Sequence, residues 1–118
     1  MRTERTKFLQ KKWKQNNKYR KQIDNIKKRF NLSLEEYNII SLDFWEKQKG
    51  CCAICGLQAS SYNKHPKEDK TTLHLDHCHK TGKIRGLLCT RCNKGLGSFS
   101  DNSDNLIKAS IYLKEYYG

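Results

Sequence analysis

The sequence is poor in apolar residues and has no long hydrophobic run. Only 36% of its 118 residues are apolar, and the mean hydropathy is -0.94. This composition predicts a single domain with one modest core. No stretch approaches the roughly 18 apolar residues that a membrane span requires, and the first residues lack the apolar centre of a signal peptide. We therefore expect a cytoplasmic protein that does not contact a membrane.

Acidic residues are scarce at the N-terminal end. Residues 1–30 contain twelve lysines and arginines but only two acidic residues, Glu4 and Asp24, so they carry +10 of the total charge of +12. A polyanion is the natural partner of such a segment, and nucleic acid is the commonest polyanion. The alternative is a highly charged helix that is merely solvated.

Glycine and proline are absent from residues 3–30, so we expect one basic helix there. Tyr19, Ile23, Ile26 and Phe30 are spaced by four, three and four residues and form a narrow apolar stripe. We expect this stripe to pack on the rest of the protein.

Two further helices follow from local patterns. Ser33-Leu-Glu-Glu36 is a capping box, and Gly50 should end the helix that it begins. The core face of that helix should comprise Leu34, Tyr37, Ile39, Ile40 and Phe44 or Trp45. The last helix is predicted over 103–117, beginning from Ser103 or Asp101, with an apolar side made of Leu106, Ile107, Ile111, Leu113 and Tyr117. Residues 58–72 resemble a polar surface loop.

Six cysteines in a cytoplasmic protein indicate metal binding or redox chemistry more strongly than they indicate disulfides. Four of them form two CxxC pairs, Cys52/Cys55 and Cys89/Cys92, and two such tight turns can complete a tetrahedral zinc site. Cys51 could compete with Cys52, but its spacing from Cys55 does not suit the turn. A thiol oxidoreductase is a weaker interpretation, because no βαβ pattern surrounds either pair. We expect structural zinc, which would supply folding free energy that the small core cannot.

The two pairs are separated by 33 residues, which is longer than the usual spacing of about 15–20 in a zinc ribbon. The insert contains the stretch HLDHCHK. Residues 71–76 and 84–88 are strand-like, and Lys80-Thr-Gly-Lys83 between them is a good turn, so a β-hairpin is predicted. A short helix should follow over 91–96.

The motifs in this part of the sequence are similar to those of a known protein family. Cys-x-x-Cys, His-Leu-Asp-His-x-His and Thr-Gly-Lys-Ile-Arg-Gly-Leu-Leu-Cys-x-x-Cys-Asn resemble the phage recombination endonuclease VII family, which belongs to the HNH or His-metal finger nucleases. The resemblance covers roughly residues 34–113. It implies an α+β fold in which a small zinc-stapled ββα-metal finger is flanked by helices. The basic N-terminal helix, residues 1–30, would then be an arm on a nuclease domain of residues 31–118.

The resemblance also implies roles for individual residues. His77 corresponds to the general base, Asp76 and Asn93 to the residues that hold a catalytic Mg²⁺ or Mn²⁺, and His74 and His79 to supporting histidines. The zinc ligands would be Cys52, Cys55, Cys89 and Cys92. The implied activity is a metal-dependent DNA endonuclease of a bacterial or phage-infected cell, which leaves 5′-phosphate and 3′-hydroxyl ends and nicks or resolves branched DNA.

The chemistry supports these residue types independently. A neutral imidazole near pKa 6.5 is a suitable base, and carboxylate and amide oxygens are hard donors that suit Mg²⁺. In a regular strand, Asp76 and His77 would point to opposite faces. For both to serve one phosphate, the strand must bend or end at that point.

The sequence also allows two other interpretations. The histidines and Cys78 could form a second zinc site, although Asp76 and Asn93 would then have no role. The protein could also be a zinc-stabilised DNA-binding module without catalysis. The chain departs from the family at Leu96, which stands where the family has an acidic residue.

Overall fold

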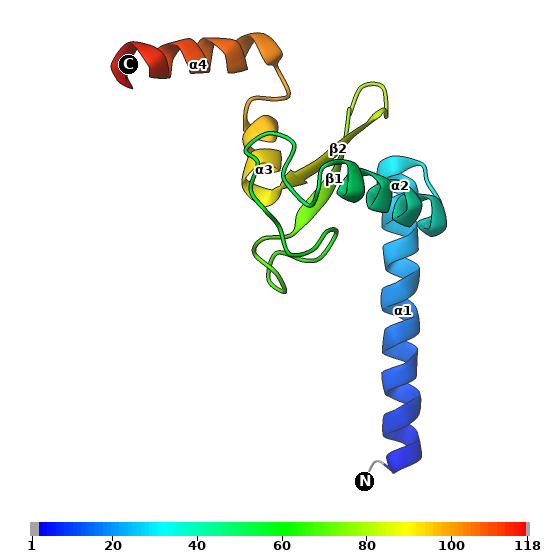
Figure 1. Ribbon diagram of the computed structural model, residues 1–118. Helices are drawn as coiled ribbons and strands as arrows, with labels where there is room; N and C mark the ends of the chain where they lie inside the picture. The colour runs from blue at the N-terminus through cyan, green and yellow to red at the C-terminus, as the bar shows by residue number, and fades with distance from the viewer. Residues whose placement is uncertain (1–2, 118) are drawn as a thin grey trace.

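The computed structural model describes residues 3–117, except for the side chains of residues 12–16. Within that part, the structure has four helices and one antiparallel pair of strands, which confirms the α+β class (Figure 1). The elements are α1 (Glu4–Phe30), α2 (Leu34–Lys47), β1 (Leu73–His77), β2 (Ile84–Cys89), α3 (Thr90–Ser98) and α4 (Ser103–Tyr117). No helix in this described part is long and apolar enough to span a bilayer.

Helix α1 packs on the molecule only through its C-terminal end. Ile26 is buried, Ile23 and Phe30 are half-buried, and Tyr19 is exposed. The apolar stripe therefore packs as predicted over its last two turns. The N-terminal part of α1 extends away from the rest of the molecule, as Figure 1 shows, and helps to make the molecule 68 Å long.

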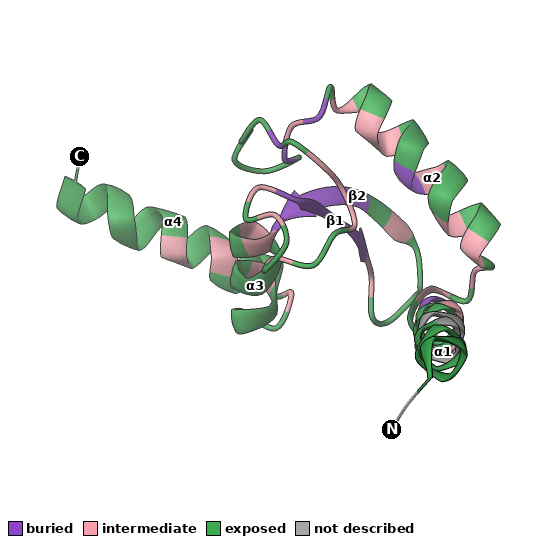
Figure 2. Ribbon diagram, turned by 90° about the horizontal axis from the view of Figure 1, so that it is seen from below, coloured by how far each residue is buried: buried purple, intermediate pink, exposed green. Residues whose placement is uncertain are grey.

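Helix α2 begins with the predicted capping box, because Ser33 Oγ accepts from the Glu36 N–H and Glu36 accepts from the Ser33 N–H. Gly50, with φ +70°, closes the turn that follows the end of the helix at Lys47. The prediction that Ile39 belongs to the core face was wrong, since Ile39 is 61% exposed. It lies about 100° around the helix from Ile40, which does pack on the core. Figure 2 shows the half-buried stripe on the inner side of α2.

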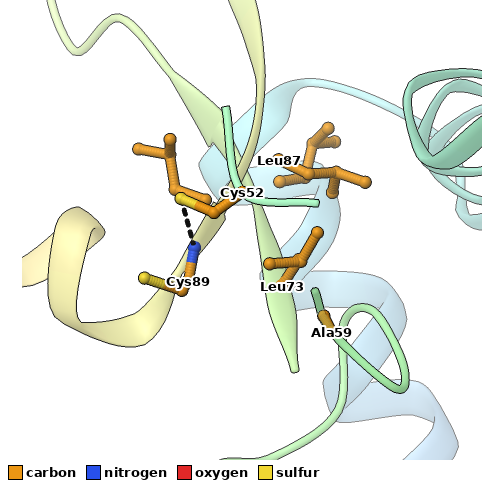
Figure 3. Packing of buried hydrophobic residues seen from close by; sticks show 7 residues of the cluster. Cys52, Ala59, Leu73, Leu87 and Cys89 are labelled. Carbon is orange, nitrogen blue, oxygen red and sulfur yellow. Dashed lines mark hydrogen bonds between the residues drawn. The ribbon is translucent and has the colours of Figure 1, made fainter. Parts of the chain in front are cut away.

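The core is small, as the composition predicted. Its buried members are Cys52, Ala59, Leu73, Leu75, Leu87, Leu88 and Cys89 (Figure 3). The two strands supply most of them, with Leu75 opposite Leu87 and Leu73 opposite Cys89. The hairpin is therefore the centre of the fold, and α3 follows it without a break.

Side-chain amides cover both outer edges of this two-stranded sheet. On the β2 edge, Gln48 accepts from the Leu87 N–H at 2.9 Å and donates to the Leu87 carbonyl at 2.9 Å. A Cβ on Gly86 would lie 2.9 Å from Gln48 Oε1, so a glycine is needed for this close approach. On the β1 edge, Asn63 Oδ1 accepts from the Leu75 N–H, while Asn63 Nδ2 donates to the buried Ser41 of α2.

These contacts change the interpretation of residues 58–72. The segment is polar, but Ala59 and Thr72 are buried in it, and Asn63 bridges α2 to β1. Asp69 accepts from Ser60, Ser61 and Thr71, and these hydrogen bonds hold the pKa of its carboxyl well below the usual range. The segment is thus an integral part of the fold and not only a surface loop.

The C-terminal helices agree with prediction in position. Helix α3 extends beyond the predicted 91–96 at both ends, and α4 has the predicted bounds, with Asn102 Oδ1 accepting from the Asn105 N–H at its start. The apolar side of α4 is largely uncovered in this chain, since Ile107, Ile111 and Leu113 are more than half exposed.

Replacing Gln48 by alanine should lower the free energy of unfolding by about 1–3 kcal/mol, because the buried Leu87 N–H loses its hydrogen-bond partner. Urea denaturation of the zinc-loaded protein measures this change. Gln58→Ala is the matched control, because Gln58 is exposed and its donor contacts are long, at 3.4 and 3.5 Å. Equal losses in the two variants would contradict the edge role of Gln48.

Candidate metal centre and catalytic hairpin

Four cysteine sulfurs converge from two parts of the chain. Cys52 and Cys55 lie in the turn after α2, Cys89 ends β2 and precedes α3, and Cys92 lies in the first turn of α3. All four Sγ atoms lie within 4.8 Å of one another. The Cys55 and Cys89 sulfurs are 3.7 Å apart, close to the edge of about 3.8 Å that a tetrahedron with Zn–S bonds of about 2.3 Å has. The cluster therefore fits zinc, which is the site that the two CxxC pairs predicted.

Backbone N–H groups favour negative charge on these sulfurs. The Cys89 N–H points at Cys52 Sγ at 3.4 Å (Figure 3), and the Cys92 N–H points at Cys89 Sγ at 3.4 Å. Burial raises the pKa of Cys52, but hydrogen bonds from the backbone of Cys89, Cys55 and Ile54 outweigh it and lower that pKa to about 6. Burial and the neighbouring sulfurs raise the pKa of Cys92 to about 12. Four thiolates so close together need a cation to offset their charge.

The other cysteines lie outside this cluster. Cys51 Sγ contacts the Lys49 carbonyl and Gln58 Oε1, so it does not compete with Cys52. Among the described residues, the four cysteines are the single group of three or more His, Cys, Asp or Glu side chains that could hold an ion. A second zinc site made of the histidines and Cys78 is therefore not formed.

The strand that carries Asp76 and His77 is irregular between these two residues. Asp76 pairs with Gly86, but His77 pairs with Ile84, so Arg85 is an extra residue in β2 and β1 ends at His77. A bulge of this kind changes the direction of nearby side chains. The expectation that the strand bends or ends at Asp76–His77 is confirmed.

His77 lies between two other rings. Its centroid is 4.7 Å from the ring of Phe30 at the end of α1 and 4.7 Å from the ring of His79. Burial lowers the pKa of His77, and repulsion from His79 lowers it further, against the opposing effect of the Asp76 carboxylate. The lowered pKa favours the neutral form of the imidazole, which is the form that can accept a proton.

The remaining predicted residues have different surroundings. His74 Nε2 lies 2.9 Å from Thr90 Oγ1 and so connects β1 to the start of α3, and burial lowers its pKa. His79 is exposed at the hairpin, and Asn93 is exposed in the first turn of α3, directly after the metal ligand candidate Cys92.

Sequence reasoning missed two residues at this site, Arg85 and Asp101. Arg85 forms a two-pronged ion pair with Asp76, with its Nε at 2.7 Å and one Nη at 3.1 Å, and also contacts Asp101 at 3.3 Å. Arg85 belongs to the Thr-Gly-Lys-Ile-Arg-Gly motif and could have been singled out there. The sequence around Asp101 does not indicate a place in this site, because only the fold brings Asp101 to the hairpin.

Two hollows meet at Arg85. A cavity of about 220 Å³ lies beside Asp76, Arg85 and Leu96. A groove of about 560 Å³ lies on the other side, between the hairpin tip and the start of α4, and is lined by His79, Lys80, Arg85, Asp101 and Asn102 among others.

The fold and site define a small α+β protein in which four cysteines that could hold a metal ion lie beside a hairpin carrying Asp76 and His77. A profile of the family described as recombination endonuclease VII matches residues 23–115, and the chain belongs to that family. The match begins inside α1, earlier than the motifs alone indicated.

Two curated phage proteins are similar to this chain. The Gene 59 protein of Mycobacterium phage D29 is 38% identical over 86 residues, which cover 70% of this chain and 47% of that protein. The Gene 59 protein of Mycobacterium phage L5 is 42% identical over 84 residues, which cover 68% and 46%. The chain thus spans about half the length of these relatives. No solved structure matches it significantly.

We expect one zinc ion per chain, and Cys89→Ser should abolish both zinc binding and cooperative unfolding. Structural zinc contributes on the order of 10 kcal/mol in zinc-finger peptides, which is as large as the whole unfolding free energy of a typical domain, about 5–15 kcal/mol. Elemental analysis and thermal melts measure the two effects. Cys51→Ser is the control, because its sulfur lies outside the cluster. Folded Cys89→Ser protein with an unchanged melting temperature would disprove a structural metal.

Proposed function

We propose that the protein is a metal-dependent DNA endonuclease of the HNH type that hydrolyses phosphodiester bonds. The observation that carries the proposal is the position of Asp76 and His77 at the irregular end of β1, in a chain that also has the tetracysteine cluster and belongs to the endonuclease VII family. In this proposal β1, β2 and α3 form the ββα-metal finger of residues 31–118, and residues 1–30 are a DNA-binding arm.

His77 acts as the general base in this mechanism. Its neutral ring takes a proton from the water that attacks phosphorus, and its contacts with Phe30 and His79 restrict the ring's orientation. His79 is exposed on the groove and is suited to contact a DNA phosphate. His74 supports the site through Thr90, since that hydrogen bond holds β1 against the start of α3.

Asp76 and Asn93 are the residues that would hold Mg²⁺ or Mn²⁺. Their donor atoms are oxygens, which suit these hard cations, whereas the four cysteine sulfurs select zinc. The ion held by Asp76 and Asn93 would supply positive charge for the phosphate and the leaving 3′-oxygen, so we expect 5′-phosphate and 3′-hydroxyl products. Asp76 is buried, and its positive partner in this structure is Arg85.

The DNA partner is inferred from charge. Arg5, Lys7, Lys11, Lys18, Arg20 and Lys21 are exposed on α1, and Lys80 and Lys83 are exposed on the hairpin turn. Such residues contact phosphates and supply affinity without reading sequence. Nicking or resolution of branched DNA is the finer form of the proposal. Cleavage of supercoiled plasmid compared with a four-way junction, with and without Mg²⁺, tests both forms.

One observation favours a second candidate, a zinc-stabilised DNA-binding module without catalysis. Both carboxylate oxygens of Asp76 are paired with Arg85, and Leu96 provides no oxygen ligand on α3. DNA binding without any Mg²⁺-dependent cleavage of either substrate would favour this module over the nuclease.

His77→Ala should lower turnover by at least about a hundredfold, because it removes the positioned base. Zinc content, melting temperature and DNA affinity should remain close to those of the parent. Single-turnover cleavage at saturating DNA measures the chemical step. His65→Ala is the matched control, since His65 is an exposed histidine to which the mechanism assigns no role.

Asp76→Ala and Asn93→Ala serve as contrasts in the same assay. Their loss of activity should be partly recovered at high Mg²⁺, whereas that of His77→Ala should not. A His77→Ala protein that cleaves at the parent's rate would refute the assignment of the base.

The basic arm should set the salt dependence of DNA affinity. Deleting residues 1–30 would remove Ile26 and Phe30, which pack on the molecule, so the informative deletion is residues 1–16. These contain six basic residues, Arg2, Arg5, Lys7, Lys11, Lys12 and Lys14. If all six contact phosphates, the deletion should reduce the slope of log affinity against log salt by about 5.

A full-length variant with these six residues changed to glutamine is the matched control for the deletion. Glutamine preserves helix propensity, so the two variants should show the same reduced slope. A slope equal to the parent's in both would mean that the arm does not bind DNA.

A further inference from the structure

Arg85 bridges two carboxylates that come from distant parts of the chain. Its Nε and one Nη contact the two oxygens of Asp76 at 2.7 and 3.1 Å, and the same Nη reaches Asp101 at 3.3 Å. The Asp76 side chain is 9% exposed, whereas the side chains of Arg85 and Asp101 are 35% and 26% exposed. Arg85 therefore has one buried and one accessible partner.

The backbone is specialised at both ends of this bridge. Arg85 is the extra residue of the irregularity opposite Asp76 and His77, which turns its side chain across the hairpin. Ser100 and Asp101 both have positive φ, at 52° and 54°, which non-glycine residues seldom adopt. This linker conformation between α3 and α4 brings the Asp101 carboxylate to the hairpin.

The guanidinium and a divalent cation compete for the same atoms. A two-pronged arginine uses both carboxylate oxygens, and a cation at Asp76 needs at least one of them. A carboxylate oxygen has more than one acceptor site, but the guanidinium and the cation repel each other at this distance, so a bound cation weakens the pairing of Arg85 with Asp76. The groove of about 560 Å³ beside Arg85 and Asp101 leaves room for Arg85 to move, and Asp101 already lies within reach.

We propose that Arg85 and Asp101 are positioning residues for the metal site. Arg85 neutralises and orients the buried Asp76 carboxylate until a divalent cation arrives, and Asp101 then retains the displaced guanidinium. This proposal rests on the proposed function, because it requires that Asp76 bind a divalent cation. It assigns the α3–α4 linker a part in metal binding, although the linker does not contact the metal.

Binding of Mn²⁺ to the zinc-loaded full-length protein, measured by electron paramagnetic resonance of the free ion, tests the proposal without any cleavage assay. Arg85→Gln should tighten Mn²⁺ binding by at least about threefold, because the competitor is gone. Asp101→Asn should weaken binding by at least about threefold, because Arg85 then pairs with Asp76 alone. Asp104→Asn, which removes a nearby exposed charge of the same sign, should leave the affinity unchanged.

The Arg85→Gln/Asp101→Asn double variant distinguishes two ways in which Asp101 could act. It could hold the displaced Arg85, or it could attract the cation by its negative charge alone. Asp101→Asn should change the affinity less than about twofold in the Arg85→Gln background, since no guanidinium remains to be held. An equal weakening in both backgrounds would overturn the proposal, because Asp101 would then act only by its charge. Unchanged affinity in both single variants would also overturn it.

Two further variants complete the experiment. Arg85→Lys keeps the charge but lacks the fork, so it should show intermediate Mn²⁺ affinity, and it replaces Arg85→Gln in the comparison if that variant does not fold. Asp76→Asn should abolish Mn²⁺ binding. If it does not, the metal site of the proposed function is wrong; if it does while Arg85 and Asp101 have no effect, only the present inference is wrong.

Discussion

The convergence of four cysteine sulfurs is the constraint on which the rest of this structure depends. Cys52 and Cys89 are members of the buried core as well as of the metal cluster, so packing and ligation involve the same residues. In the described part of the chain, the other buried apolar residues are Ile26, Ala59, Leu73, Leu75, Leu87 and Leu88, so the core is small. A metal at the cluster would join the turn after α2, the end of β2 and the start of α3, which are the three segments that bound the hairpin.

The hairpin connects the cysteine cluster to the proposed active site. Cys89 ends β2, and the pairing of β2 with β1 leads from the cluster to the irregularity at Asp76 and His77. Gln48 and Asn63 hold the two outer edges through their side-chain amides, so the strands cannot easily slip. Phe30 contacts His77, which connects the basic helix α1 to the ring that would take the proton.

The site contains two sets of possible metal ligands that prefer different ions. The sulfurs receive backbone N–H groups and suit zinc, whereas Asp76 is an oxygen donor that an arginine neutralises in this structure. In the proposed function, this separation would allow one short chain to hold a structural metal at the cysteines and a different cation beside His77. The family match from residue 23 to residue 115 includes the C-terminal end of α1 and most of α4, whereas the N-terminal part of α1 lies outside it.

The sequence by itself determined the features that local rules govern. The capping box at Ser33, the two CxxC turns, the hairpin turn and the bounds of α4 each depend on residues within a few positions of one another. Only the tertiary structure decided the exposure of Ile39, the bridging by Gln48 and Asn63, and the contact of Arg85 with Asp101. These features depend on contacts between residues that are far apart in the sequence. The contacts can form only after the strands and the α3–α4 linker have taken their conformations.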